Sequence, residues 1–75
     1  NGNIEALNNL ANLYAILHRF DDAEKYYLQS INKGNLQALY NLAILYKEEN
    51  RKDDAEKYYL LAIDNGEARA LLNLL

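Results

Sequence analysis

Two acidic pairs, Asp21-Asp22 and Asp53-Asp54, are the residues of this sequence whose types and spacing most invite a chemical role. Neighbouring carboxylates can hold a metal ion or share a proton. Adjacent positions on a helix diverge by about 100 degrees, however, so the two carboxylates of one pair do not converge. No glycine-bearing calcium loop surrounds them either. We therefore expect both pairs to stabilise the first turn of a helix, where the helix dipole favours negative charge.

The other residues that could take part in catalysis stand alone. His18 is the only histidine and lies in an expected turn, so we expect an exposed turn residue. Ser30 is the only serine or threonine, and Ala62 fills the equivalent place later in the chain, which indicates a small packing residue. A nucleophile also needs a base within reach, and none is evident. The sequence predicts no catalytic, metal-binding or cofactor-binding site, and we expect no enzyme.

A repeat organises the elements that position these residues. The octet Asp21–Leu28 returns unchanged as Asp53–Leu60. Residues 3–34 laid over residues 35–66 are identical at 19 of 32 positions. A fixed period of this size is typical of stacked helical units, none of which can bury its apolar face alone. The expected organisation is one repeat domain, 1–75, with units at 3–34 and 35–66 and a partial unit at 67–75.

Each full unit reads as two helices. Apolar residues recur at spacings of three and four, which is the period of one helix face, and the absence of proline favours helix throughout. Gly34 and Gly66 each supply the left-handed residue that ends a helix, and Asn50 tolerates the positive φ of a tight turn. Loops of about three residues make the two helices of a unit antiparallel. The expected helices span about 3–17, 21–33, 35–49, 53–65 and 67–75.

Composition argues against several classes of partner. The net charge of −3 speaks against nucleic acid, because phosphate binding needs a concentrated Lys/Arg surface. No apolar run approaches the roughly 18 residues of a membrane span, and no basic segment precedes an apolar one as in a signal peptide. Without cysteine there is no disulfide and no thiolate metal site. Because the chain starts at Asn1 and not at Met, we expect it to be a piece of a longer protein.

Alternating small and aromatic residues resemble those of a known family. The pattern resembles the tetratricopeptide repeat, and the residues that carry the resemblance are Leu42-Ala43…Tyr46 followed by Ala55…Tyr59…Ala62. The period of 32 is shorter than the 34 of that family. The segment 62–70, with a glycine midway between two alanines, is similar to the related Sel1-like repeats, although their hairpin loop is longer. The resemblance implies an all-α fold, a right-handed α-α superhelix of two full hairpins plus one extra helix, acting as a non-catalytic scaffold for protein-protein interaction.

In that family the first helices of the hairpins line a concave face that binds peptides. The resemblance implies that the face presents Asn8, Asn9, Asn12, Tyr40, Asn41, Ile44, Arg69 and Asn73, together with Glu5, Lys47 and Glu48. Asparagine dominates this set, and its amide can donate and accept hydrogen bonds at once, which suits an extended peptide or protein ligand.

Members that grip the C-terminal carboxylate of a chaperone use five of these positions. Carried over to this chain, the five positions are Asn8, Asn12, Asn41, Arg69 and Asn73. Asn12 and Asn41 match the family pattern, and Arg69 keeps a cation where the family has lysine. The other two positions lack the family's cations, so we expect no clamp that depends on several positive charges.

A second surface is expected at the C-terminal end. Leu71, Leu72, Leu74 and Leu75 form an apolar segment for which the sequence contains no covering second helix. Such a patch is normally occupied, and repeat arrays need a polar capping helix for solubility. Two interpretations stay open. The chain is either a scaffold that binds a peptide or protein on the concave face, or a structural module that associates as a homo-oligomer, end to end, or with further repeats of a longer array.

Overall fold

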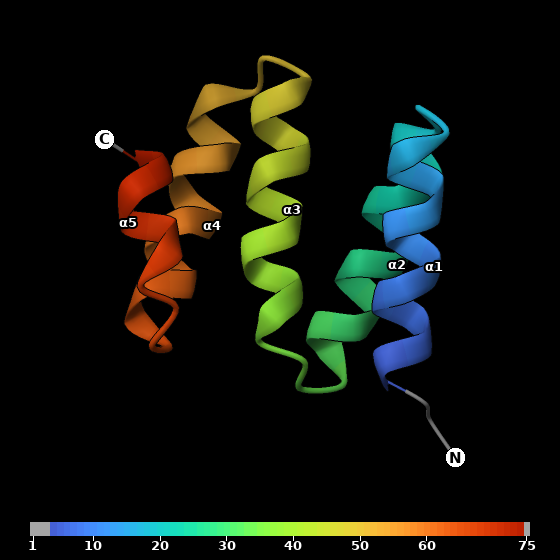
Figure 1. Cartoon of the computed structure of the whole chain (residues 1–75), viewed down its shortest axis with the longest axis horizontal. Coiled ribbons are helices and arrows are strands. Elements are labelled where there is room, and N and C mark those ends of the chain that lie inside the picture. Colours follow the sequence, from blue (N-terminus) through green and yellow to red (C-terminus); the bar gives the residue numbers. More distant parts are fainter. Residues whose placement is uncertain (1–3, 75) are drawn as a thin grey trace.

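The computed structural model describes residues 4–74, and these fold into five helices (Figure 1). They are α1 (Ile4–Ile16), α2 (Phe20–Asn32), α3 (Gln37–Glu48), α4 (Lys52–Asp64) and α5 (Arg69–Leu74). No strand occurs in this part of the chain, and the predicted all-α fold of two hairpins plus one extra helix is confirmed.

The helices form two layers. α1 packs on α2 and α3 packs on α4, so each repeat unit is one hairpin, while α5 packs on α4. α2 also contacts α3 and thereby joins the hairpins. In Figure 1, α1, α3 and α5 run across the front of the view, with α2 and α4 behind and between them. The first helix of every unit therefore lies in one layer, where the predicted groove residues are found.

One turn geometry ends the first four helices. Two residues after each helix, at sixteen-residue intervals, φ is positive at His18, Gly34, Asn50 and Gly66. The next amide reaches back five residues, as when Asn35 N donates to Ser30 O at 3.0 Å. This Schellman arrangement satisfies carbonyls that the helix leaves free. Both predicted glycines and Asn50 are confirmed. The sequence reading treated His18 only as a turn residue, although it occupies the Asn50 position and histidine is among the side chains that tolerate this conformation.

α3 and α5 begin two residues later than expected because a side chain caps each of them. Oδ1 of Asn35 accepts a hydrogen bond from Gln37 N at 3.0 Å. Glu67 takes the equivalent place before α5, and its Oε1 accepts from Arg69 N at 3.2 Å. Such local bonds hold the capping residue outside the helix.

α2 and α4 begin one residue earlier than expected. The amide of Ala23 donates to the carbonyl of Arg19 at 3.0 Å, and the equivalent bond 32 residues later is 2.9 Å. The first helical hydrogen bond therefore closes on the arginine of the turn, which brings Phe20 and Lys52 into their helices. The acidic pairs still lie in the first turns, as predicted.

Alanines and tyrosines make up much of the core. Four alanines that occupy equivalent places in the two units, Ala11, Ala23, Ala43 and Ala55, are all buried. Among the tyrosines, Tyr27, Tyr46 and Tyr59 are buried, whereas Tyr14, the equivalent of Tyr46, is only partly buried. Small residues let helix backbones approach, and the aromatic rings fill the space beside them. Tyr14 is more exposed because no hairpin precedes α1 within residues 4–74.

Candidate functional site

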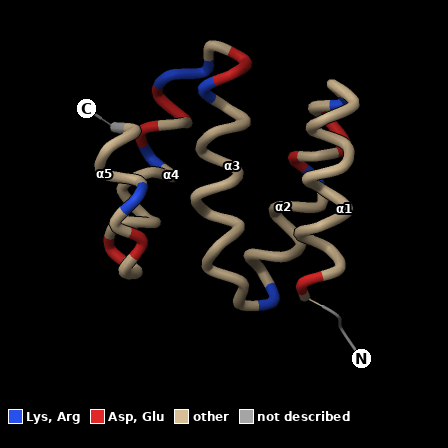
Figure 2. The backbone as a smooth tube through the Cα atoms, in the orientation of Figure 1, with Lys and Arg blue, Asp and Glu red and all other residues tan. Residues whose placement is uncertain are grey.

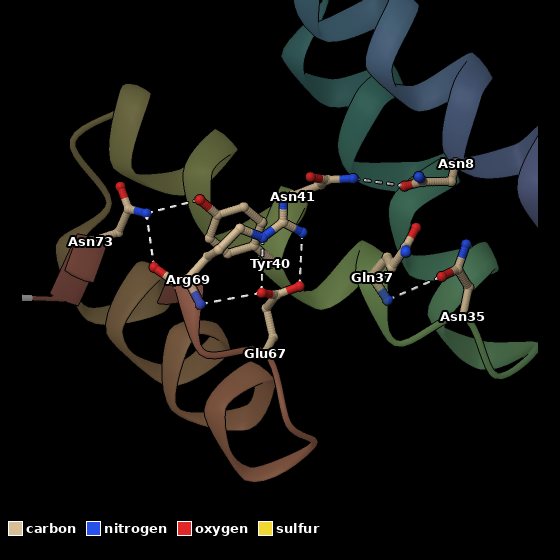
Figure 3. Close-up of polar contacts among 8 residues, drawn as sticks. All are labelled: Asn8, Asn35, Gln37, Tyr40, Asn41, Glu67, Arg69 and Asn73. Carbon is tan, nitrogen blue, oxygen red and sulfur yellow. Dashed lines mark hydrogen bonds and ion pairs between the residues drawn. The ribbon is translucent and has the colours of Figure 1, made fainter. Parts of the chain in front are cut away.

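Amide side chains connect the first helices of successive units. Nδ2 of Asn41 on α3 donates to Oδ1 of Asn8 on α1 at 3.2 Å. One unit later, Nδ2 of Asn73 on α5 donates to the hydroxyl of Tyr40 on α3 at 2.9 Å. Both bonds join residues 33 positions apart, and Figure 3 shows them along the same layer. We call this pair of contacts the amide ladder. It brings predicted groove residues from three helices together.

The ladder leaves some polar groups of the predicted groove without a partner among residues 4–74. Asn9 is exposed, and its side chain makes no hydrogen bond to another residue in 4–74. The side-chain oxygen of Asn41 likewise has no partner in this stretch, since only the nitrogen takes part in the ladder. By contrast, Asn8 is only 8% exposed, and Asn12 already accepts a hydrogen bond from the Tyr27 hydroxyl. Some predicted groove residues thus make hydrogen bonds within the fold, whereas others have polar groups that remain unpaired in this part of the chain.

Arg69, the only cation among the eight predicted binding residues, is already paired. Its Nε and Nη2 donate to Oε1 and Oε2 of Glu67 at 2.9 and 2.8 Å (Figure 3). Its guanidinium carbon also lies 4.7 Å from the ring centre of Tyr40. The hydrogen bonds from Arg69 lower the pKa of the Glu67 carboxyl from 4.5 to about 2. The positive charge at this end of the groove is therefore largely neutralised.

Two pockets open between neighbouring first helices. The larger, of about 880 Å³, lies over α2 between α1 and α3, and the smaller, of about 440 Å³, is formed by α3, α4 and α5. Residues lining the larger pocket include Asn12, Ile16, Phe20, Tyr27, Asn41 and Ile44. Residues lining the smaller pocket include Lys47, Asn50, Lys52, Glu56, Tyr59 and Asn73. The repeat relates the two pockets, because Tyr27 and Tyr59 are 32 residues apart, as are Asn41 and Asn73.

The pockets include some predicted residues and add others. Among the predicted residues, Asn12, Asn41 and Ile44 line the larger pocket and Asn73 lines the smaller one, whereas Asn8, Asn9, Tyr40 and Arg69 line neither. Sequence reasoning did not predict Tyr27 and Tyr59 as groove residues, because the resemblance places only the first helices of the hairpins at the concave face. Burial raises the pKa of the Tyr27 hydroxyl to about 12. Both tyrosines could have been predicted from their positions on second helices, because a side chain there can line the space between two neighbouring first helices.

The residues first considered for catalysis have structural roles. His18 is exposed and lies edge-on to Phe20, with ring centres 5.5 Å apart. Ser30 is fully buried, and its hydroxyl donates to the Ile4 carbonyl at 3.1 Å. One aspartate of each acidic pair forms an ion pair with the arginine of the preceding turn. Arg19 pairs with Asp22 at 2.7 Å, and Arg51 pairs with Asp54 at 2.9 Å. Within the described residues, no group of histidine and acidic side chains could hold a metal ion, and none of the helices has the length and apolarity to cross a membrane.

Comparison with protein families identifies the fold. Two family profiles, each described as a tetratricopeptide repeat, match residues 4–33 and 36–65. The chain belongs to the tetratricopeptide repeat family. Each match covers one hairpin of the structure, and the similarity to Sel1-like repeats stays a prediction. No curated protein shows a significant match to the chain.

Membership narrows the functional class. Tetratricopeptide repeats generally mediate interactions between proteins and are typically scaffolds without enzymatic activity. At the five positions compared with carboxylate-gripping tetratricopeptide proteins, the single cation is Arg69, which Glu67 already holds. Asn8 is largely buried and bonded to Asn41. These contacts agree with the prediction that no carboxylate clamp exists here, which stays a prediction.

The predicted association surface of this tetratricopeptide chain lies at α5. Leu71 is 49% exposed and Leu72 is 76% exposed, the highest value among the exposed large apolar side chains in residues 4–73. The side chain of Leu74 and the whole of Leu75 lie outside the described residues. The part of the predicted patch that can be seen is therefore open to solvent.

Proposed function

We propose that this chain binds an extended segment of a partner protein in the groove formed by α1, α3 and α5. The amide ladder is the observation that carries the proposal. The bonds Asn41–Asn8 and Asn73–Tyr40 hold polar side chains in place along three helices before any ligand arrives. Holding binding groups in position reduces the conformational entropy lost on association. The unused amide groups of Asn9 and Asn41 then supply donors and acceptors for a peptide backbone.

The charge distribution supports the same ligand class. α1 carries a single charged residue, Glu5, and α3 carries only Lys47 and Glu48 at its end. Figure 2 shows the middle turns of both helices without charged residues. An uncharged surface that presents amides suits the neutral, alternating donors and acceptors of an extended peptide. Such a surface is poorly suited to a strongly charged ligand.

Library selection followed by NMR tests this proposal. A random dodecapeptide library is panned on the immobilised chain, and recovered peptides are titrated into protein labelled with ¹⁵N. We expect the largest shifts at the side-chain amides of Asn9, Asn41 and Asn73. Asn41→Ala should weaken binding about fivefold, which corresponds to about 1 kcal/mol. Asn32→Ala, an exposed asparagine at the end of α2, is the matched control and should leave the affinity unchanged. Shifts confined to the outer faces of α2 and α4 would contradict the proposal.

A second candidate function, self-association through α5, is favoured by the exposure of Leu72. Large exposed apolar side chains at the end of a repeat array are normally covered. A second copy of the chain is the occupant to test. Sedimentation at increasing concentration should then show a dimer or larger species without peptide, and Leu72→Glu should restore the monomer. A wild-type monomer at high micromolar concentration, with unchanged solubility of Leu72→Glu, would exclude this candidate.

A further inference from the structure

The hydroxyl of Tyr59 is buried and has no hydrogen-bond partner among residues 4–74. Tyr59 lies on α4, is 2% exposed, and lines the smaller pocket. Folded proteins rarely leave a buried hydroxyl unpaired, because the group has lost its hydrogen bonds to water without replacement. Because Tyr59 also lines a pocket, its unpaired hydroxyl points to an acceptor supplied from outside the chain.

The first unit shows how the same position is satisfied internally. Tyr27 stands 32 residues before Tyr59 and lines the larger pocket, and its hydroxyl donates to Oδ1 of Asn12. The residue 32 positions after Asn12 is Ile44, which cannot accept a hydrogen bond. A single difference between the units therefore removes the acceptor and keeps the donor.

The smaller pocket is large enough for more than a water molecule. Its volume of about 440 Å³ far exceeds the roughly 30 Å³ that one water occupies in the liquid. Lys47 and Lys52 at its edge are exposed, and their long flexible side chains can turn aside to admit a ligand atom. Asn50 and Asn73 add amide groups. The pocket can thus hold a polar side chain that reaches the Tyr59 hydroxyl.

The two pockets differ in chemistry although the repeat relates them. Ala15 and Phe20 line the larger pocket at the positions where Lys47 and Lys52 line the smaller one. Ile16 and Ile44 add apolar surface to the larger pocket, and among the described residues its one charged lining residue is Glu48. Neighbouring pockets of unlike chemistry along one groove select unlike residues at neighbouring positions of a ligand.

We infer that the smaller pocket binds an oxygen-bearing residue of the partner peptide and that an oxygen of this residue accepts the hydrogen bond of the Tyr59 hydroxyl. An apolar residue of the same peptide fills the larger pocket. The inference rests on the proposed function, since the peptide must lie along α1, α3 and α5. The oxygen comes either from an Asp, Asn, Glu or Gln side chain or from a main-chain carbonyl of the peptide.

Affinity and thermal stability measured together on one variant test this inference. Tyr59→Phe removes only the hydroxyl. The dissociation constant of dodecapeptides selected on the wild-type chain should rise about tenfold, or about 1.4 kcal/mol. The melting temperature of Tyr59→Phe without peptide should stay equal or rise, because an unpaired buried group is lost. Tyr58→Phe is the matched control, since Tyr58 is the adjacent residue of α4 and packs against Tyr46 with ring centres 5.6 Å apart. It should change the affinity less than twofold.

Ile44→Asn provides an independent test. It restores the acceptor that Asn12 supplies in the first unit, so the side-chain oxygen introduced on α3 should take the Tyr59 hydrogen bond. If the oxygen belongs to a side chain, selection on the wild-type chain should show a preference for Asp, Asn, Glu or Gln at one peptide position, and peptides selected on Ile44→Asn should lose that preference. Replacing that residue by alanine in a wild-type-selected peptide identifies the oxygen. If the alanine peptide binds the wild-type chain more weakly but binds Tyr59→Phe as well as the original peptide does, the acceptor is a side-chain oxygen. If the alanine peptide binds the wild-type chain as tightly as the original peptide does, the acceptor is the main-chain carbonyl.

Two results would overturn the inference. In the first, Tyr59→Phe binds the selected peptides as tightly as the wild-type chain does. In the second, Tyr59→Phe has a lower melting temperature than the wild-type chain, which would show that the hydroxyl has a hydrogen-bond partner within the folded chain. If peptides bind in the groove but Tyr59→Phe has no effect on their affinity, this inference fails and the proposed function stands. If the wild-type chain selects no peptide at all, the proposed function fails and this inference fails with it.

Discussion

The hydroxyl of Tyr46 on α3 donates a 2.5 Å hydrogen bond to Oε2 of Glu24 on α2, and this bond ties the second hairpin to the first. Arg51 adds to the connection, because its Nη1 lies 3.5 Å from the same oxygen and its guanidinium carbon lies 4.3 Å from the ring centre of Tyr46. Burial and the hydrogen bond to Glu24 raise the pKa of the Tyr46 hydroxyl. One carboxylate thus helps to set how the two units stack.

Removing the Tyr46 hydroxyl should weaken the contact between the hairpins. We expect Tyr46→Phe to lower the free energy of unfolding by about 1–2 kcal/mol, because the hydroxyl bonds to a charged carboxylate in a largely buried position. Urea unfolding followed by circular dichroism measures this difference.

Tyr14 offers a matched control for that measurement. It lies 32 residues before Tyr46, stacks on Tyr26 at 5.7 Å and has Arg19 over its ring at 4.7 Å. Within residues 4–74 no carboxylate of another hairpin bonds to its hydroxyl. Tyr14→Phe should therefore cost less than about 0.5 kcal/mol. Equal losses in the two variants would show that the bond to Glu24 does not stabilise the stacking.

Buried tyrosine should make the fold sensitive to alkali. Burial raises the pKa of Tyr27 from 10.0 to about 12, so between these values the unfolded chain releases a proton that the folded chain retains. The contribution of Tyr27 to stability is fully present below pH 10 and is lost as the pH rises through about 12. We expect the free energy of unfolding to fall across this window, and Tyr27→Phe to make the fall shallower. Urea unfolding on both sides of the window tests this, and an equal fall in the variant would contradict it.

Acid should loosen α5 through Glu67. Its folded-state pKa is lowered from 4.5 to about 2, so the contribution of the ionised carboxylate is present above pH 4.5 and is lost as the pH falls through about 2. The same carboxylate accepts the amide of Arg69 at the start of α5. We expect the protection of the Ala70 and Leu71 amides against hydrogen exchange to fall in this window more than that of α1 amides.

Glu67→Gln is the control for the acid experiment. This variant should show the lower protection of α5 already at neutral pH and little further change between pH 4.5 and 2, because the ionisable group is gone. A fall in protection that is the same for α1 and α5 would mean that acid acts on the whole fold and not on the Glu67–Arg69 pair.

Much of the fold could be predicted from the sequence because its determinants are local. Helix periodicity, the 32-residue repeat and the glycines at 34 and 66 predicted five helices and their turns, and each helix starts within two residues of the expected position. The cap at Asn35 was missed because it depends on a side-chain bond to Gln37 that composition does not reveal. For the groove, the resemblance predicted the asparagines, but not that Asn8 and Asn41 bond to each other.

The sequence by itself determined the helices, their pairing into hairpins and the turns that join them, since backbone hydrogen bonding and turn chemistry depend on residues close in the chain. Only the tertiary structure decided what equivalent residues do. Leu13 and Leu45 occupy the same place in their units, yet Leu13 is 50% exposed and Leu45 is 1% exposed. Tyr27 and Tyr59 are likewise equivalent, yet within residues 4–74 only the Tyr27 hydroxyl has an acceptor. Burial and hydrogen bonding depend on which surface lies opposite a side chain, and stacking places a different surface opposite each unit.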